Sequence, residues 1–540
     1  MAKYVIGIDY GTLSMRAVLV DTLDGREIAS QEYVYPHGIM NERDICGGEP
    51  LSTTALAHPD DYLEALGVTV RGLLREGGVT ASDVVGICID ATATTMLPYL
   101  SDGTPLSSLA EFCDNPHAYI KLWKHHGAEK EAEKMTRVAL SRAEAWLDEY
   151  GGTISAEWML PKMLETLRLA PEVYRTADRF GEVADWLTER LTGVPCRSAC
   201  FAGYKALYVD AYPSREYLGE VAPDFADAID KMGGTPAALG SVAGYITEDG
   251  ARLVGLKPGT AVATPAIDAH AALPAAGAVG DGDLTLIIGT STCHILISEK
   301  NIPIKGMCGK VYGGVIDGYY AYETGQPCVG DMLAWFVENS LPGSYKMAAE
   351  ARGVSVFEYL NSLICERKIA SSGLMVLDWW NGNRTPYVDY NLSGTIIGLT
   401  MMTRPEDIYL AMLEAIAYGT RRMVEIYREG GIEIRRIVAA GGIPRKNPAL
   451  MQIMADVLGE DVYVTSSREA GAKGCAIYAA TAAGIYPGIA EATRAMADEI
   501  LTVYSPRVGA YDRYSELYRI YVELSEGFAG SEIMKRLRGV

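Results

Sequence analysis

Short apolar runs along the chain alternate with longer segments of helical periodicity. The run Val5 to Asp9 predicts a buried strand, Met15 to Asp21 predicts its hairpin partner, and Leu23-Asp24-Gly25 predicts a turn. By the same criteria, further strands are expected at 84–90, from 283 onward and at 437–440, and helices at 59–75, 121–140, 161–169, 182–191, 408–427, 449–458 and 474–483. Strands that alternate with helices predict an α/β fold.

The length of the chain predicts more than one domain. A chain of 540 residues exceeds what one hydrophobic core usually supports. The segment Leu253 to Ala278 is rich in Ala, Gly and Pro, which suits a hinge-like crossing between two lobes. We therefore expect an N-terminal domain over residues 1–280 and a C-terminal domain over residues 281–540.

Composition excludes several classes of protein. The net charge of −21 argues against a nucleic-acid surface, which needs clustered Lys and Arg. No apolar stretch approaches the ~20 residues of a membrane helix, and Asp9 interrupts the first apolar run, so neither a membrane partner nor a signal peptide is expected. The ten Cys lack paired metal-type spacing, which predicts reduced thiols and a cytoplasmic protein.

A polar string directly follows the first predicted strand. Gly11 permits a tight turn, Thr12 and Ser14 offer hydroxyl groups, and Arg16 completes the string. Asp9 could orient Mg²⁺ through water, because Mg²⁺ keeps much of its hydration. A plain hairpin with polar turn residues is the alternative. The complete pattern favours a phosphate-binding turn.

A second Gly-Thr turn, Gly289-Thr290, follows the apolar run Leu284 to Ile287. By itself it is as easily a surface turn. Two such turns in two halves of one chain suggest a nucleotide gripped between two lobes. Because the chain is strongly acidic, backbone amides, hydroxyls and Mg²⁺ would have to hold the phosphates locally.

Two further segments carry candidate chemistry. Gly441-Gly442 after a predicted strand would let the backbone approach a flat ligand closely, and Asn447 could cap the next helix. Asp268 ends an apolar, Ala-rich stretch, where an acid is poorly placed for solvent and could act as a buried base. His270 is an alternative base, although a lone His near a core is more often structural.

These strings, in this order, resemble the FGGY family of carbohydrate kinases over nearly the whole chain. The resemblance implies a two-domain actin-like ATPase fold (ribonuclease H-like), with nucleotide in the interdomain cleft, Mg²⁺ as cofactor and Asp268 as the catalytic aspartate. The matching strings are D-Y-G-T-L-S-M-R for the first phosphate motif, I-I-G-T-S-T for the second, A-A-G-G-I-P-R-K-N for the adenosine motif, and I-D-A-H around the aspartate.

Other segments are similar to the ribulokinases of that family, which act on L-ribulose in arabinose catabolism. They are D-A-T-A-T-T-M-L-P at 90–98, D-N-P-H at 114–117, K-L-W-K-H-H at 121–126, Y-G-G-T-I-S-A-E-W at 150–158 and D-W-W-N-G-N-R at 378–384. The Arg-Glu clamp and Asn-Gln-Arg string of glycerol kinases do not occur here.

The resemblance implies that Ala93, Lys205, Asp268 and Glu323 line a ketopentose site. Lys205 could donate to sugar oxygens and Glu323 could accept from sugar hydroxyls, whereas a surface ion pair is the alternative for each. ATP and a ketopentose are the expected ligands, and a homodimer is expected from the family. D-ribulose or a xylulose is an alternative substrate, and an actin- or Hsp70-like ATPase acting on a protein is an alternative of another class.

Overall fold

A computed structural model describes residues 3–304, 306–365, 367–467 and 469–538. The chain forms two compact units, each composed of several segments. Unit 1 comprises Met1–Val279, Gly309–Ala321 and Glu469–Asp498, and unit 2 comprises Gly280–Cys308, Tyr322–Arg468 and Glu499–Val540.

Unit 1 is built on a mixed sheet with the strand order β3-β2-β1-β5-β10-β9, and β11 also pairs with β5. The predicted hairpin is confirmed: β1 pairs antiparallel with β2, while its other edge pairs in parallel with β5. Gly25, in the predicted turn, has a φ of 71°. The strands are β1 Tyr4–Tyr10, β2 Ser14–Asp21, β3 Glu27–Val34, β5 Val84–Ala91, β9 Val242–Tyr245, β10 Ala261–Ala263 and β11 Ala266–Ile267.

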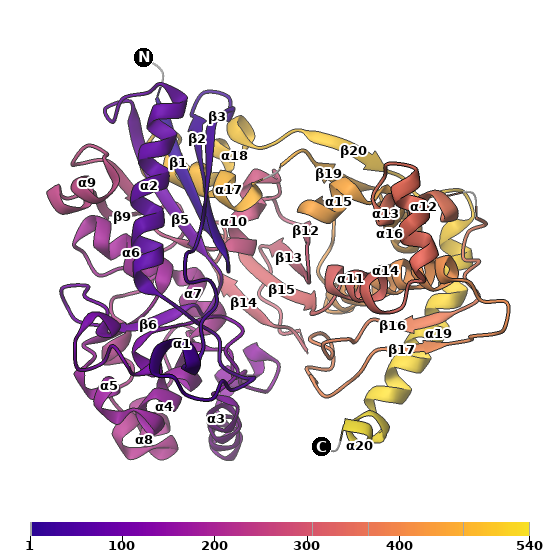
Figure 1. Ribbon diagram of the computed structural model, residues 1–540, viewed down its shortest axis with the longest axis horizontal. Helices are drawn as coiled ribbons and strands as arrows, with labels where there is room; N and C mark the ends of the chain where they lie inside the picture. The colour runs from indigo at the N-terminus through magenta and orange to yellow at the C-terminus, as the bar shows by residue number, and fades with distance from the viewer. Residues whose placement is uncertain (1–2, 305, 366, 468, 539–540) are drawn as a thin grey trace. The chain divides into compact units, whose positions relative to one another are not determined.

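Helices pack against this sheet, among them α2 (Pro59–Gly77) and α17 (Ala470–Ala482), the latter drawn in orange beside the indigo strands in Figure 1. The Tyr10 hydroxyl donates to the carbonyl of Tyr62 on α2. On α17, Gly474 lies so close to helix α10 (Asp268–Ala275) that a Cβ there would be 1.6 Å from the carbonyl oxygen of Ala271. This close approach explains why α17, late in the sequence, belongs to unit 1.

The predicted interlobe crossing at 253–278 is wrong. The whole segment lies inside unit 1, where it supplies β10, β11 and α10. Its small apolar residues serve close packing, since Ala271 and Ala275 are fully buried. The change from unit 1 to unit 2 occurs after Val279, and the division of the chain into domains at 280/281 stays a prediction.

The predicted helix at 121–140 is wrong over its first eight residues. The helix α3 spans only Glu129–Ser141, and Lys121 instead ends the short strand β7 (Ile120–Lys121). The polar side chains of Lys121 and His125 turn inward to the buried Glu165. Gly127 lies against the same carboxylate, where a Cβ would be 2.1 Å from its Oε1. Pairing with one buried carboxylate therefore overrides the helical pattern.

The rest of unit 1 packs around a second core cluster that includes Met96, Met159, Met163 and Phe180. A small sheet with the order β4-β7-β6-β8 lies in this part of the unit. Its strands and the remaining elements of unit 1 are β4 Leu56–Ala57, β6 Met96–Tyr99, β8 Arg179–Glu182, β14 Gly309–Tyr312, α1 Glu42–Cys46, α4 Met159–Leu169, α5 Pro171–Thr176, α6 Val183–Thr192, α7 Ala199–Lys205, α8 Arg215–Val221, α9 Glu248–Val254 and α18 Ile489–Met496.

Unit 2 repeats the strand arrangement of unit 1. Its sheet runs β15-β13-β12-β18-β19-β20; β12 pairs antiparallel with β13 and in parallel with β18, as β1 does with β2 and β5. The strands are β12 Asp283–Ile288, β13 Thr292–Ser298, β15 Tyr320–Gln326, β16 Met375–Leu377, β17 Thr395–Ile397, β18 Arg436–Ala440, β19 Val462–Thr465 and β20 Ile500–Tyr504. Both predicted Gly-Thr turns thus connect the first two strands of equivalent sheets.

The predicted helices of unit 2 are confirmed. The longest, α14 (Pro405–Glu429), packs against α16 (Pro448–Leu458) and α19 (Ala510–Ala529). The other helices are α11 Gly330–Asn339, α12 Gly343–Ala351, α13 Val356–Ile364, α15 Gly442–Lys446 and α20 Ile533–Arg538. No helix in the described part of the chain is both long and apolar enough to cross a membrane.

Candidate active site

Three carboxylates of unit 1 gather where neighbouring parallel strands end. Asp9 of β1 is paired in register with Asp90 of β5. The strand β11 pairs with the same edge of β5 through Ile267 and Ala91, and Asp268 follows directly as the first residue of α10. The local fold therefore brings the predicted metal residue and the predicted base to one edge of the sheet.

This carboxylate cluster is electrostatically strained. Asp90 is fully buried, and the Cys475 thiol donates to its Oδ2 at 3.2 Å. Burial raises the pKa of Asp90 well above its ordinary value, and the charges of Asp9 and Asp268 add to the effect. Burial also raises the pKa of Asp9, against the hydrogen bond from Asp90 and the charge of Arg16. Such a cluster favours a shared proton or a bound cation.

The first Gly-Thr turn connects β1 and β2. The Gly11 amide donates to the carbonyl of Ser14 at 3.0 Å, which closes the turn. The Thr12 hydroxyl accepts a hydrogen bond of 3.0 Å from the indole N–H of Trp123. A partly exposed aromatic ring from a distant segment thus binds directly to the predicted phosphate motif.

Two other residues of that motif bind to one acidic side chain of β3. The Ser14 hydroxyl donates to Oε1 of Glu32 at 3.0 Å, and Nε of Arg16 contacts the same oxygen at 3.2 Å. Arg16 also lies 3.7 Å from Oε2 of Glu469. The structure therefore gives both side chains protein partners, and their contact with a nucleotide stays a prediction.

The second Gly-Thr turn, in unit 2, is exposed at Gly289 and Thr290. The Gly289 amide donates to the carbonyl of Ser291 at 2.9 Å. The carbonyl of Thr290 accepts from the amide of Val329 at 2.8 Å, which anchors the turn to the start of α11. The turn is therefore rigidly attached at its base and open at its tip.

The two glycines of the Gly441-Gly442 pair have different surroundings. Gly441 has a φ of 107°, and a Cβ there would lie 2.6 Å from the carbonyl oxygen of Ile288. A Cβ on Gly442 would meet no atom within 4 Å. Asn447 caps α16 by accepting from the amide of Leu450, and its Nδ2 donates to the Tyr409 hydroxyl. The helix cap at Asn447 is confirmed, whereas its contact with nucleotide stays a prediction.

This difference within the glycine pair predicts two separable effects. Gly441→Ala should lower the free energy of unfolding by about 1–3 kcal/mol, because the side chain forces both strain and a backbone clash. Gly442→Ala should change it by less than about 0.5 kcal/mol. Gly442→Leu should raise KM for ATP several-fold and leave KM for the sugar unchanged, if this open space faces the adenosine. Urea unfolding and steady-state kinetics measure both, and equal effects on the two KM values would make the turn purely structural.

The turn that carries Ala93 is strained. Thr94 has a φ of 55°, which is unfavourable for a β-branched residue and costs on the order of 1–3 kcal/mol. Its hydroxyl donates to the Ala93 carbonyl, and the hydroxyls of Thr92 and Thr95 lie 2.6 Å apart. Strain of this kind persists only where surrounding contacts enforce it.

Lys205 lies at the end of α7, near a buried acid. Burial raises the pKa of Glu182 to about 8, against the positive charges of Arg197, Lys162 and Lys205. Neither carboxylate oxygen of Glu182 accepts a hydrogen bond from the residues that the structure describes. Lys205 therefore contributes to the electrostatics of a buried polar layer in unit 1.

The alternative base, His270, is placed as a structural residue. It is 1% exposed, and its ring centroid lies 4.2 Å from that of Tyr204. Glu323 lies in β15 of unit 2 and is 4% exposed. The structure thus places the predicted sugar residues in two units: Ala93, Lys205 and Asp268 in unit 1, and Glu323 in unit 2.

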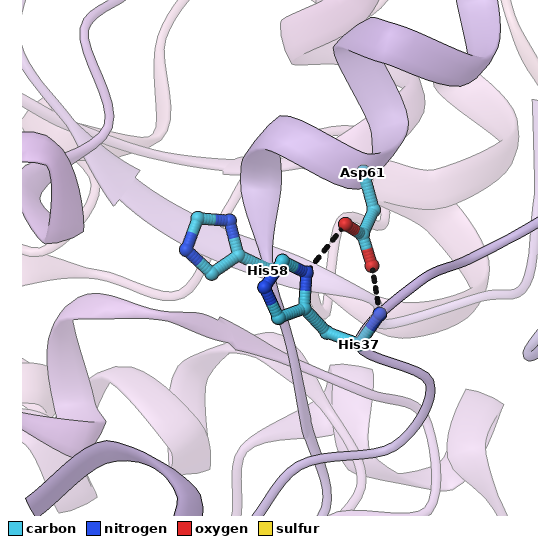
Figure 2. Close-up of side chains that lie close together, drawn as sticks. All are labelled: His37, His58 and Asp61. Carbon is cyan, nitrogen blue, oxygen red and sulfur yellow. Dashed lines mark hydrogen bonds and ion pairs between the residues drawn. The ribbon is translucent and has the colours of Figure 1, made fainter.

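A separate cluster with metal-type side chains lies beside α2, as Figure 2 shows for His37, His58 and Asp61. The Nδ1 atom of His37 lies 2.6 Å from Oδ1 of Asp61, and Nδ1 of His58 caps α2 by accepting from the amide of Asp60. The two imidazole rings are stacked at 4.5 Å and 18°, so their in-plane lone pairs do not converge on one point. Helix capping and ring stacking account for this cluster.

Sequence reasoning missed several residues of this site. Asp90 had a usable signal, because it ends an apolar strand just as Asp9 does. Trp123 stood in the K-L-W-K-H-H segment, but nothing in the sequence linked it to Thr12. Lys162 and Glu182 had no signal, because only tertiary contacts bring them to the turn at 92–95 and the strand that follows it.

The repeated sheet order, with a Gly-Thr turn at the same place in each sheet, defines the class of fold: an actin-like protein built of two α/β units. Residues 4–274 match the N-terminal domain of the FGGY family of carbohydrate kinases, and residues 284–483 match its C-terminal domain. The chain belongs to the FGGY family of carbohydrate kinases, which use ATP to phosphorylate sugars.

Two relatives that match over nearly the full length are named ribulokinases. The ribulokinase of Anoxybacillus flavithermus is 44% identical over 546 residues, which cover 99% of this chain and 97% of the relative. The ribulokinase of Mycolicibacterium smegmatis is 43% identical over 99% of this chain and 96% of its own length.

Solved structures support the fold. The xylulose kinase from Rhodospirillum rubrum superposes with a TM-score of 0.78 at 23% identity, covering 97% of this chain and 98% of its own. The glycerol kinase of Plasmodium falciparum, solved with ADP, gives a TM-score of 0.74 at 16% identity, covering 97% of this chain and 98% of its own.

Proposed function

We infer that this protein is a ribulokinase, which transfers the γ-phosphoryl group of ATP to L-ribulose and forms L-ribulose 5-phosphate in the use of L-arabinose. The observation that carries this inference is the identity of 38–44% to ribulokinases over nearly the whole chain. The carboxylate cluster of Asp9, Asp90 and Asp268 supplies the chemistry that such a transfer needs.

Asp268 is proposed as the general base. A sugar hydroxyl is a weak acid, so its proton must leave as its oxygen attacks the γ-phosphorus and the bond to the β-phosphate oxygen breaks. Asp268 lies close enough to Asp90 that its charge, together with burial and the charge of Asp9, raises the pKa of Asp90, so the carboxylates of this cluster repel one another. Proton transfer to Asp268 relieves that repulsion.

The same cluster fits Mg²⁺, because close carboxylates with raised pKa values gain most from a bound cation. Asp9, and Asp90 beside it, would hold the ion, in part through water. When bound, Mg²⁺ would neutralise part of the negative charge of the phosphates. The two turns are proposed to hold the phosphates: Gly11 and Gly289 shape the turns, and Thr12 and Thr290 present their amides and hydroxyls to the phosphate oxygens.

Ala93, Lys205 and Glu323 are proposed to form the ketopentose site. An ammonium group and a carboxylate can together fix the direction of several sugar hydroxyls, and a small residue at Ala93 leaves room for the carbon chain. A homodimer and a cytoplasmic location stay predictions.

A coupled assay of ADP release across the four 2-ketopentoses tests the proposed function. Turnover that depends on sugar, with the largest kcat/KM for L-ribulose, supports it. A larger value for D-ribulose or a xylulose would keep the chemistry and change the substrate. ATP hydrolysis that ignores every sugar would favour an ATPase that acts on a protein partner.

A further inference from the structure

Lys162, on α4, is a fully buried lysine whose donors are used on backbone carbonyls. Its Nζ donates to the carbonyl of Thr94 at 2.8 Å and to the carbonyl of Leu122 at 2.7 Å. Buried ammonium groups are costly unless they are well bonded, so a lysine in this position needs a reason.

An ordinary reason for a buried lysine is an ion pair, and the neighbouring Lys121 shows that arrangement. Its Nζ lies 2.7 Å from Oε2 of Glu165 and also donates to the hydroxyl of Thr166. Lys162 differs, because its two strong bonds go to two loops instead of a carboxylate. Burial lowers the pKa of Lys162 to about 7, although the negative charges of Glu157 and Glu182 favour its charged form.

The first of those loops is the turn at 92–95, which carries Ala93. Thr94 has its strained φ of 55° at the residue whose carbonyl Lys162 binds. The turn is also attached to β8 and α6, because the Val183 amide donates to the Thr95 carbonyl at 2.7 Å. An anchor at the carbonyl of Thr94 opposes relaxation of the turn into an unstrained conformation.

The second loop leads to the first phosphate motif. Leu122 immediately precedes Trp123, whose indole N–H donates to the Thr12 hydroxyl at 3.0 Å. One ammonium group therefore connects the proposed sugar turn to a residue that contacts the proposed phosphate turn. A contiguous chain of hydrogen bonds and one peptide link runs from Thr94 through Lys162 and Leu122–Trp123 to Thr12.

We propose that Lys162 is a positioning residue of the ketopentose site: it holds the turn at 92–95 in its strained conformation and in register with Thr12, and so sets which ketopentose fits beside Ala93. This inference rests on the proposed function and deepens it, since it names a residue that determines the shape of the sugar site.

The test is Lys162→Met, which keeps the length and volume of the side chain and removes its donors. The expected result is a fall of about 10- to 100-fold in kcat/KM for L-ribulose, mainly through KM, and altered ratios of kcat/KM among the four 2-ketopentoses. The affinity for ATP should change by less than about twofold. Unchanged sugar ratios and KM would overturn the proposal.

Lys121→Met is the matched control, because it removes an equally buried lysine of the same layer that binds α4 and not the turn at 92–95. It should lower stability and leave the sugar ratios as they are. If both variants changed the ratios of kcat/KM among the ketopentoses equally, the change would come from a general loss of stability, and the proposal would fail.

Thr94→Gly supplies a second, independent test. Glycine adopts a φ of 55° without strain, so Lys162→Met should cost less in a Thr94→Gly background than in the native one. An equal cost in both backgrounds would contradict an anchoring role.

Amide hydrogen exchange separates this proposal from the proposed function. Peptides that cover 92–95 and 122–123 should exchange faster in Lys162→Met than in Lys121→Met, whatever the activity. Faster exchange in a protein that shows no sugar-dependent turnover would overturn the ribulokinase assignment alone. Unchanged exchange would overturn the anchoring by Lys162 alone.

Discussion

Asp268→Asn is expected to lower kcat by about 100- to 10,000-fold and to leave ATP binding nearly unchanged. Asparagine matches the shape of aspartate and can still accept the hydrogen bond that Asp268 Oδ1 takes from the Ala269 amide at 2.7 Å. It cannot take up the proton of the attacking hydroxyl. It also removes one of the charges that raise the pKa of Asp90, so the folded protein should not be destabilised.

Steady-state kinetics, which give kcat, and calorimetric titration with ATP, which gives its affinity, test this prediction. Asp249→Asn is a suitable control, since its carboxylate is exposed on α9 of the same unit and pairs with Arg252 at the surface. Near-normal turnover in Asp268→Asn would remove this residue from the role of base. His270 would then be tested next, although its burial against Tyr204 favours a structural role.

Lys205→Ala and Glu323→Ala are each expected to reduce kcat/KM for the sugar by roughly 10- to 100-fold while sparing the affinity for ATP. Loss of one charge-assisted hydrogen bond to a sugar hydroxyl costs on the order of 1.5–3 kcal/mol. Removal of Lys205 has a second effect, because its charge lowers the pKa of Glu182. Without that charge, Glu182 holds its proton to higher pH.

Lys205→Arg keeps the positive charge and should preserve the ionisation of Glu182, so a partial recovery of kcat/KM would isolate the contribution of charge from that of exact geometry. Lys257→Ala, at an exposed lysine of unit 1, is the control for nonspecific loss of charge. Wild-type sugar kinetics in both alanine variants would show that Lys205 and Glu323 lie outside the site.

The sequence by itself determined those helices, strands and turns whose conformation depends only on neighbouring residues. The hairpin of β1 and β2, the strand β5 and the helices α2, α14 and α16 follow from hydrophobic period and turn residues. The two Gly-Thr turns and their place after a buried strand were also readable, because glycine and hydroxyl residues have local effects on the backbone. The motif order then indicated the family.

Only the tertiary structure decided how distant segments combine. The segment 253–278 became buried structure instead of a hinge, because Gly474 of α17 allows that helix to pack closely against it. The region 121–128 left its helical pattern because Glu165, some forty residues away, binds Lys121 and His125. Asp90 joined Asp9 through strand register, and Lys162 reached Thr94 through the packing of α4. Periodicity reports which face of an element is buried, but it does not say which distant polar group that face will meet.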